Sequence, residues 1–102
     1  MEKQHESESL HQFIQVIDGA ICHNIYAGYI KILKNTHPSR SISVQLRVTS
    51  DPPNDDVTGQ RISYLMNPII VGANSSSEIG CDVPGPTRQR FFFVPEIVKW
   101  GN

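Results

Sequence analysis

The stretch Ile42-Ser-Val-Gln-Leu-Arg-Val48 alternates apolar and polar residues without exception. Successive side chains of a β-strand point to opposite faces, so this alternation predicts a strand with one buried face and one face in water. The rest of the chain has the same bias, with 12 Ile and 8 Val against 4 Leu and 3 Ala. Branching at Cβ favours strands over helices. We therefore expect a mainly β protein, with α+β as the alternative, built as a small antiparallel sandwich or partly open barrel of roughly four to six strands.

The segment on the N-terminal side of this strand carries a helical pattern. Four apolar residues follow the i, i+3, i+4, i+7 spacing of one helix face, namely Leu10, Phe13, Ile14 and Ile17. Gly19 lies where a helix C-cap is expected. We favour a short N-terminal helix here, while Asp18-Gly19 could instead form the two-residue turn of a hairpin. Residues 21–33 are expected to form a strand that pairs antiparallel with residues 42–49.

The segments on the C-terminal side are interrupted by proline. Residues 61–71 predict a strand region that Pro68 restricts to an edge, a bulge or two short strands. Residues 72–77 are expected to be a loop, and residues 88–100 a closing strand interrupted by Pro95. Residues 1–8 are polar and charged, which is typical of a flexible end. A chain of 102 residues is then organised as this end followed by one β-rich domain over 9–102.

The two cysteines, Cys22 and Cys81, are interpreted as small apolar residues with free thiols. The first eight residues lack the positive start and apolar run of a secretory leader, and no apolar run is long enough to span a bilayer. We therefore expect an intracellular, cytoplasmic protein. Asn74-Ser75-Ser76 fits the N-glycosylation acceptor pattern, but such a protein would not meet the glycosylating enzyme.

No motif of a catalytic, metal or cofactor site is present in the sequence. The acidic residues Asp51, Asp55 and Asp56 fail the EF-hand pattern, because Gly and Glu are missing at the required positions. Cys22 and His23 are adjacent, so on a strand they point to opposite faces and cannot join one zinc site. Walker, dinucleotide-binding, serine-hydrolase and zinc-protease motifs are also missing. We expect no enzyme activity, no catalytic residues, no metal and no cofactor.

The run from Phe91 to Trp100 is the most informative feature for function. It begins with three Phe and one Val before Pro95, and a continuous apolar run is typical of a strand covered on both faces. A domain this small has few layers to cover both faces, so we expect a second copy to cover one of them. The expected interface residues are Phe92, Val94, Ile97 and Trp100. The predicted function is that of a non-enzymatic protein that self-associates as a homodimer or larger homo-oligomer, such as a viral or phage structural or accessory protein.

The alternative function is binding to nucleic acid, including RNA, or to an anionic membrane surface. Two arginines alternate beside aromatic residues near the C-terminus, a composition found on sheets that hold single strands. The net charge of −1 gives no general support to this alternative, because 9 Lys and Arg balance 10 Asp and Glu. The basic sheet face would consist of Arg88, Arg90, Arg61, Arg47 and Lys31.

Overall fold

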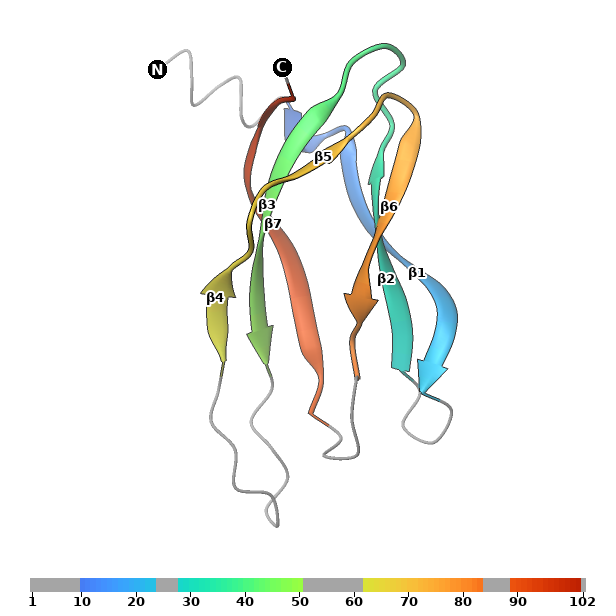
Figure 1. The fold of residues 1–102 in the computed structure, drawn as a ribbon, viewed down its shortest axis with the longest axis vertical. Helices are drawn as coiled ribbons and strands as arrows, with labels where there is room; N and C mark the ends of the chain where they lie inside the picture. Colours follow the sequence, from blue (N-terminus) through green and yellow to red (C-terminus); the bar gives the residue numbers. More distant parts are fainter. Residues whose placement is uncertain (1–9, 24–27, 51–61, 84–88, 102) are drawn as a thin grey trace.

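The computed structural model describes residues 10–23, 28–50, 62–83 and 89–101, which form two antiparallel sheets (Figure 1). The molecule is elongated, with extents of 47 × 29 × 18 Å. Seven strands lie in the described part of the chain: β1 (Ile14–His23), β2 (Gly28–Asn35), β3 (Ile42–Ser50), β4 (Ser63–Leu65), β5 (Ile69–Val71), β6 (Ser75–Cys81) and β7 (Phe91–Trp100). The prediction of a mainly β fold is confirmed, with one strand more than the expected maximum.

The two sheets have different strand orders. Sheet A has the order β1-β2-β6. In sheet B, β3 is central and pairs with β7 on one side and with both β4 and β5 on the other. Strand β3 alternates buried and half-buried residues along its whole length, as its sequence predicts. Pro68 separates the short strands β4 and β5, which confirms one of the three outcomes expected for residues 61–71.

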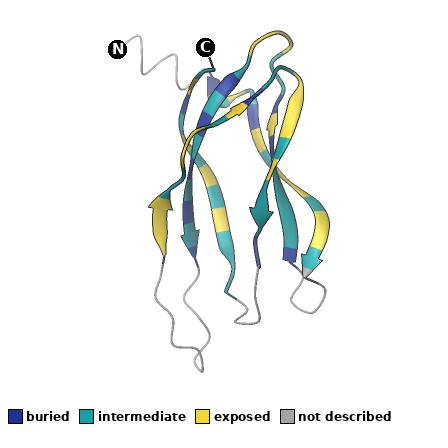
Figure 2. Cartoon of the chain, in the orientation of Figure 1, coloured by how far each residue is buried: buried dark blue, intermediate teal, exposed yellow. Residues whose placement is uncertain are grey.

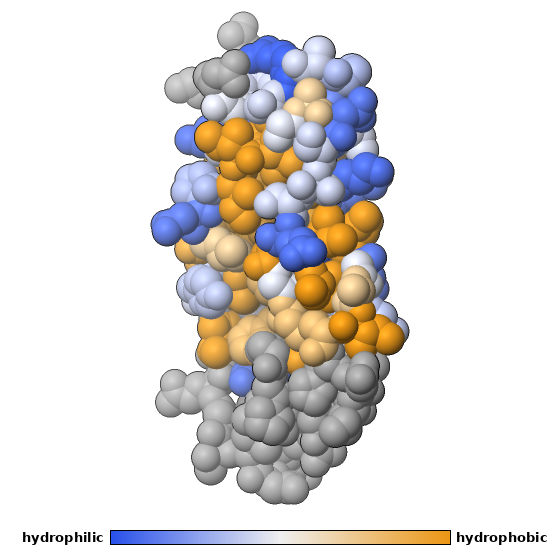
Figure 3. All heavy atoms as spheres, turned by 45° about the vertical axis from the view of Figure 1, so that its right-hand side comes forward, coloured by the Kyte–Doolittle hydropathy of each residue, from blue (hydrophilic) through white to orange (hydrophobic). Residues whose placement is uncertain are grey.

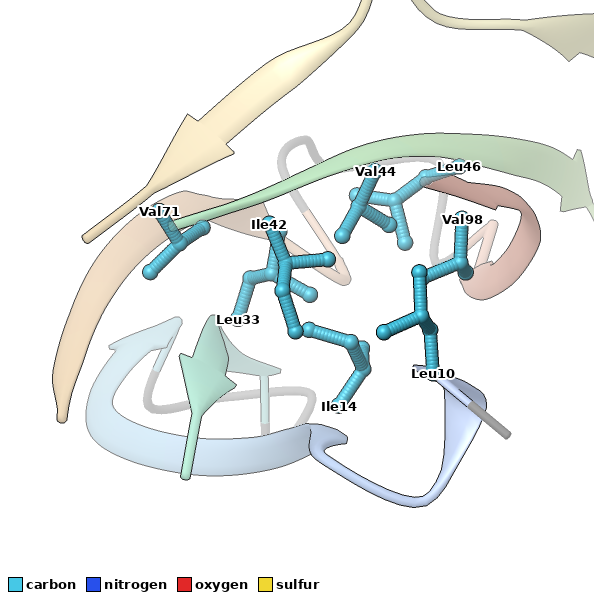
Figure 4. Close-up of a cluster of buried hydrophobic side chains, with 8 residues drawn as sticks. All are labelled: Leu10, Ile14, Leu33, Ile42, Val44, Leu46, Val71 and Val98. Carbon is cyan, nitrogen blue, oxygen red and sulfur yellow. The ribbon is translucent and has the colours of Figure 1, made fainter. Parts of the chain in front are cut away.

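One hydrophobic core lies between the sheets (Figure 4). Sheet A contributes Ile14 and Leu33, and Leu10 enters from the turn before β1. Sheet B contributes most of the cluster, namely Ile42, Val44, Leu46, Val71 and Val98. Figure 2 shows that buried residues alternate with half-buried residues along β3. This alternation directs one face of β3 into the core and the other face away from it.

The predicted N-terminal helix is wrong. The described residues contain no regular helix, and Leu10–Phe13 form a single turn that the Phe13 N–H closes by donating to the Leu10 carbonyl at 3.0 Å. Ile14 begins β1, which pairs with β2 from Ile14↔Asn35 onward. The hairpin alternative is wrong as well, because Asp18 and Gly19 lie inside β1 at a register shift. Pairing with β2 supplies hydrogen bonds that override the weak helical spacing of this segment.

The expected pairing of residues 21–33 with 42–49 is also wrong. Strand β2 pairs with β1 and β6, while the chain crosses to sheet B before β3 begins. The buried Asn35 holds this crossing in place. Its Nδ2 donates to the carbonyls of Arg40, Val71 and Gly72 at 2.9, 3.0 and 3.1 Å, and its Oδ1 accepts the His37 N–H at 2.8 Å.

The expected loop over residues 72–77 is wrong in its second half, since β6 begins at Ser75. Three consecutive serines carry no strand signal of their own. Pairing with β2 in the register Asn35↔Ser75 to Leu33↔Ser77 nevertheless holds them extended. The only segment left as a turn is Gly72–Ser75, in which the Ser75 N–H donates to the Gly72 carbonyl at 3.2 Å.

Candidate interaction surface on strand β7

The outer face of β7 exposes large apolar side chains. Phe92 and Val94 are 43% and 53% exposed, and they lie opposite Thr49 and Arg47 of β3 on the face away from the core. Ile97 lies opposite Gln45 on the same face and is half-buried. We call the set Phe92, Val94 and Ile97 the β7 face. The structure therefore places three of the four predicted interface residues on one surface.

The fourth predicted interface residue, Trp100, lies on the other side of β7. A register shift near Glu96 changes the alternation, so Trp100 lies opposite the buried Ile42 and packs against the core. Its ring contacts the His37 ring edge-on at a centroid distance of 5.4 Å. The Arg40 guanidinium lies 3.7 Å from the Trp100 ring centroid, within the range of a cation–π contact. Trp100 thus stabilises the fold at the C-terminal end of β7.

An ion pair crosses the outer face of sheet B beside the β7 face. Arg47 Nε and Nη2 donate to the two carboxylate oxygens of Glu96 at 3.0 and 2.9 Å. These hydrogen bonds raise the pKa of Arg47 and lower the pKa of Glu96. Both groups are in solvent, so the pair contributes little to stability. Because the charges of Arg47 and Glu96 are opposite, the pair adds no net charge beside the β7 face.

One edge of β7 has no strand partner in the described part of the chain. On β3, the Leu46 carbonyl accepts the Met66 N–H at 2.8 Å on the side of β4. The N–H and C=O groups of successive residues in a strand point to opposite sides of it. The backbone groups of Arg47, the next residue, therefore point toward β7. The backbone groups of its pairing partner Val94 point back toward β3. Those of Pro95, the next residue along β7, therefore point to the open edge.

Two features of this open edge oppose the addition of another strand. Proline has no N–H, so Pro95 offers no donor at the position where an incoming strand would need one. The register shift beside it interrupts the regular ladder. Proline and bulges are the devices by which natural sheets protect their edges from other chains. This edge of β7 is therefore a poor site for the addition of another strand.

The three predicted basic residues that the structure describes do not lie on one face. Lys31 pairs with Asp18, and its Nζ lies 3.7 Å from the buried carboxylate of Asp82. Arg90 Nη1 also pairs with Asp82, at 3.0 Å. Arg47, on the outer face of sheet B, is paired with Glu96, as described above. Arg61 and Arg88 lie outside the described residues.

Asp82 links the two sheets, and the sequence analysis missed it. Its side chain is 3% exposed and accepts the Tyr29 N–H of β2 at 2.8 Å in addition to its two ion pairs. Its carbonyl accepts the N–H of Phe91, the first residue of β7, at 2.7 Å. A buried charge needs such partners, since an unpaired one is costly. In the sequence, Asp82 stands among Gly80, Pro84, Gly85 and Pro86, residues typical of irregular segments, so no local pattern indicates this role.

The prediction of free thiols is wrong, because Cys22 and Cys81 form a disulfide with a Cα–Cα distance of 5.9 Å. Their strands lie on opposite sides of β2, where two strand spacings would be about 9.6 Å. The pairing of β1 with β2 is irregular next to this bridge, with register shifts on both sides of Ile21. The sulfurs and an Asp82 oxygen lie within 4.8 Å of one another. Bonded sulfurs are not thiolates, so this cluster does not favour a metal.

The arrangement of the remaining polar groups does not form a recognisable catalytic constellation in the described part of the chain. His37 Nδ1 accepts the N–H groups of Ser39 and Arg40 at 3.1 and 3.0 Å, which is a turn-stabilising role. A shallow depression of about 480 Å³ is lined by Tyr64, Leu65, Met66, Asn67, Pro68 and Ile69. Its one titratable side chain is a tyrosine. His5, Asp51, Asp55 and Asp56 lie outside the described residues, as does the side chain of His23.

A second group of exposed apolar residues lies on sheet A, where Ile17 was predicted to lie on a helix and Ile21 to begin a strand. Ile17 and Ile21 of β1 are 40% and 57% exposed. Figure 3 brings the side of sheet A forward and shows hydrophobic residues interrupting the polar surface there.

No protein-family model, curated protein or solved structure matches this chain. In the described residues, no helix has the length and apolar character required to cross a bilayer.

Proposed function

We propose that this protein is a non-enzymatic assembly or interaction protein that associates with further copies of itself through the β7 face. The observation that carries the proposal is the exposure of Phe92 and Val94 on a ten-residue strand. Both side chains are of a type that proteins normally bury. In this proposal the two sheets form a small sandwich, and the outer face of sheet B is the contact surface.

A second copy of the chain is the partner that this surface fits best. Arg47 and Glu96 neutralise each other beside the β7 face, so two identical faces meet without repulsion between net charges. A two-fold contact brings the same patch of both subunits together. The protected edge of β7 directs the contact to the side chains, in agreement with this arrangement. A viral or phage structural subunit is one class of protein with these properties.

The expected association is weak. Complete burial of a large apolar side chain contributes roughly 1.5–3 kcal/mol. Phe92 and Val94 are already about half covered in the monomer, so each gains less than this. Association also costs translational and rotational freedom. We therefore expect a monomer–dimer equilibrium that shifts over the micromolar to millimolar range.

Sedimentation or light scattering over a wide concentration range tests the proposal. The wild-type mass should rise with concentration, whereas the double variant Phe92→Thr, Val94→Thr should remain monomeric. Threonine keeps the β-branching of Val94, and its strand preference is high like that of Phe and Val. The control variant Ile17→Thr, Ile21→Thr removes comparable apolar surface from sheet A and should associate like the wild type. A wild type that remains monomeric at millimolar concentration, or equal masses for wild type and the β7 variant, would refute the proposal.

The nucleic-acid alternative has a separate test. The three described residues of the predicted basic face, Lys31, Arg47 and Arg90, are paired with carboxylates, which gives this alternative little support. Binding of a single-stranded oligonucleotide at low salt that weakens steeply with added salt would favour it over self-association. The same measurement on vesicles with anionic lipids distinguishes a membrane surface from a nucleic acid.

The disulfide bears on where the protein works. Disulfides form and persist in oxidising environments and are rare in the cytosol. The predicted cytoplasmic location implied free thiols, and the disulfide disagrees with that implication. We propose an oxidising compartment or an extracellular setting instead.

A further inference from the structure

We propose that Asn74 is an N-glycosylation site. The acceptor pattern requires Asn, any residue except Pro, and then Ser or Thr, which Asn74-Ser75-Ser76 satisfies. Such a short pattern is weak when it stands alone. Its placement in the fold and the disulfide supply two independent observations in its favour.

Asn74 lies at the exposed tip of the turn between β5 and β6. It is the third residue of the turn Gly72–Ser75 and has a φ of 54°, a left-handed conformation that Asn tolerates well. Within the described part of the chain its side-chain amide has no hydrogen-bond partner. The amide nitrogen that would carry a glycan is therefore accessible to solvent and is not needed by the fold.

The backbone holds this turn in place. The Asn74 N–H donates to the His37 carbonyl at 2.9 Å, and the Gly72 carbonyl accepts from the buried Asn35 at 3.1 Å. Ser76, whose hydroxyl completes the acceptor pattern, lies next in β6 and is exposed. Ser77, the following residue, lies opposite the buried Leu33. A glycan on Asn74 thus extends into solvent without displacing a packed side chain.

The disulfide Cys22–Cys81 provides the second observation. Protein N-glycosylation belongs to chains that enter secretory compartments, and these compartments are also the ones that oxidise thiols. One environment therefore accounts for both the disulfide and an acceptor sequence in an exposed turn. The expectation that the chain never meets the glycosylating enzyme assumed a reducing intracellular setting, and the disulfide argues against that setting.

The reaction transfers an oligosaccharide from a lipid diphosphate donor to the side-chain amide. A bond forms between Asn74 Nδ2 and the anomeric carbon of the first sugar, while the bond from that carbon to the diphosphate oxygen breaks. The lipid diphosphate leaves with the bonding electrons, and the amide proton passes to a base of the transferase. No oxidation or reduction takes place.

The proposal is independent of self-association through the β7 face. In Figure 1 the turn before β6 lies at the upper end of the molecule, while β7 begins with Phe91 near the lower end. Phe92 and Val94 therefore lie far along the molecule from Asn74. A glycan at the turn leaves the β7 face uncovered, so failure of one proposal does not imply failure of the other.

Production of the full chain behind a cleavable leader in a eukaryotic secretory host tests the site. We expect most secreted chains to carry one glycan, which an amidase specific for N-linked glycans removes with conversion of Asn74 to Asp. Asn74→Gln and Ser76→Ala should each abolish the modification. Ser76→Thr should retain it, and the neighbouring control Ser77→Ala should not affect it.

Peptide mass spectrometry of the same samples decides the outcome. A secreted wild type that has its disulfide formed but carries no glycan overturns the proposal, as does modification that persists in Asn74→Gln. The Ser76→Thr variant changes the same residue but keeps the acceptor hydroxyl. It therefore shows whether Ser76→Ala loses the modification through the missing hydroxyl or through misfolding. Recovery of modification in Ser76→Thr but not in Ser76→Ala supports the site directly.

Discussion

Removal of the disulfide should destabilise the protein strongly. The bridge joins residues 59 positions apart, so it restricts more than half of the unfolded chain. The loop-entropy relation gives a stabilisation of about 4 kcal/mol at 25 °C for a loop of this length. Small domains have a total unfolding free energy of roughly 5–15 kcal/mol. The double variant Cys22→Ala, Cys81→Ala should therefore lose a large part of its stability.

Denaturant unfolding at equilibrium measures this change. The oxidised wild type is compared with the double variant and with the wild type kept in reductant. The double variant and the reduced wild type should unfold at similar denaturant concentrations. Both should differ from the oxidised protein by about 4 kcal/mol. A thiol titration of the unfolded, unreduced protein should detect no free thiol. Two free thiols in that titration, or a loss below about 1 kcal/mol in the variant, would refute the reasoning.

Three further predictions concern the core, the ion pair and the open edge. Leu33→Ala should cost about 2–5 kcal/mol in the unfolding free energy, since Leu33 is fully buried between the sheets. For Glu96→Gln, the small stability difference from wild type should be present above the ordinary pKa of Glu. It should vanish as the pH falls through the lowered pKa of Glu96, because protonation breaks the ion pair; pH-dependent unfolding curves that stay parallel would contradict this. Pro95→Thr restores an N–H at the open edge and should increase high-mass species in light scattering, whereas Lys99→Thr should not.

Local patterns were sufficient for part of the fold. The alternation over residues 42–48 identifies β3 and its buried face, because a period of two has one structural meaning when it is unbroken. Pro68 separates β4 from β5 because proline cannot donate to a ladder. The pattern failed at Ile14–Ile17, where the same residues fit a helix face and a strand, and pairing with β2 decided between them.

The candidate surface was found only in part from the sequence. Phe92 and Val94 were identified from an apolar run that a small domain cannot cover. Trp100 belongs to the same run, but a register shift turns it toward Ile42 and the core. No local signal distinguishes these residues, since the shift depends on how β7 pairs with β3.

The amino-acid sequence by itself determined that the chain is rich in strands, where its most regular strand lies and that its C-terminal segment is rich in large apolar residues. Tertiary structure alone decided the sheet to which each strand belongs, the bond between Cys22 and Cys81 and the pairing of Lys31 and Arg90 with Asp82. The physical reason is the range of the interactions. Side-chain periodicity is a property of neighbours along the chain, whereas ladders, disulfides and ion pairs join residues that only the folded chain brings together.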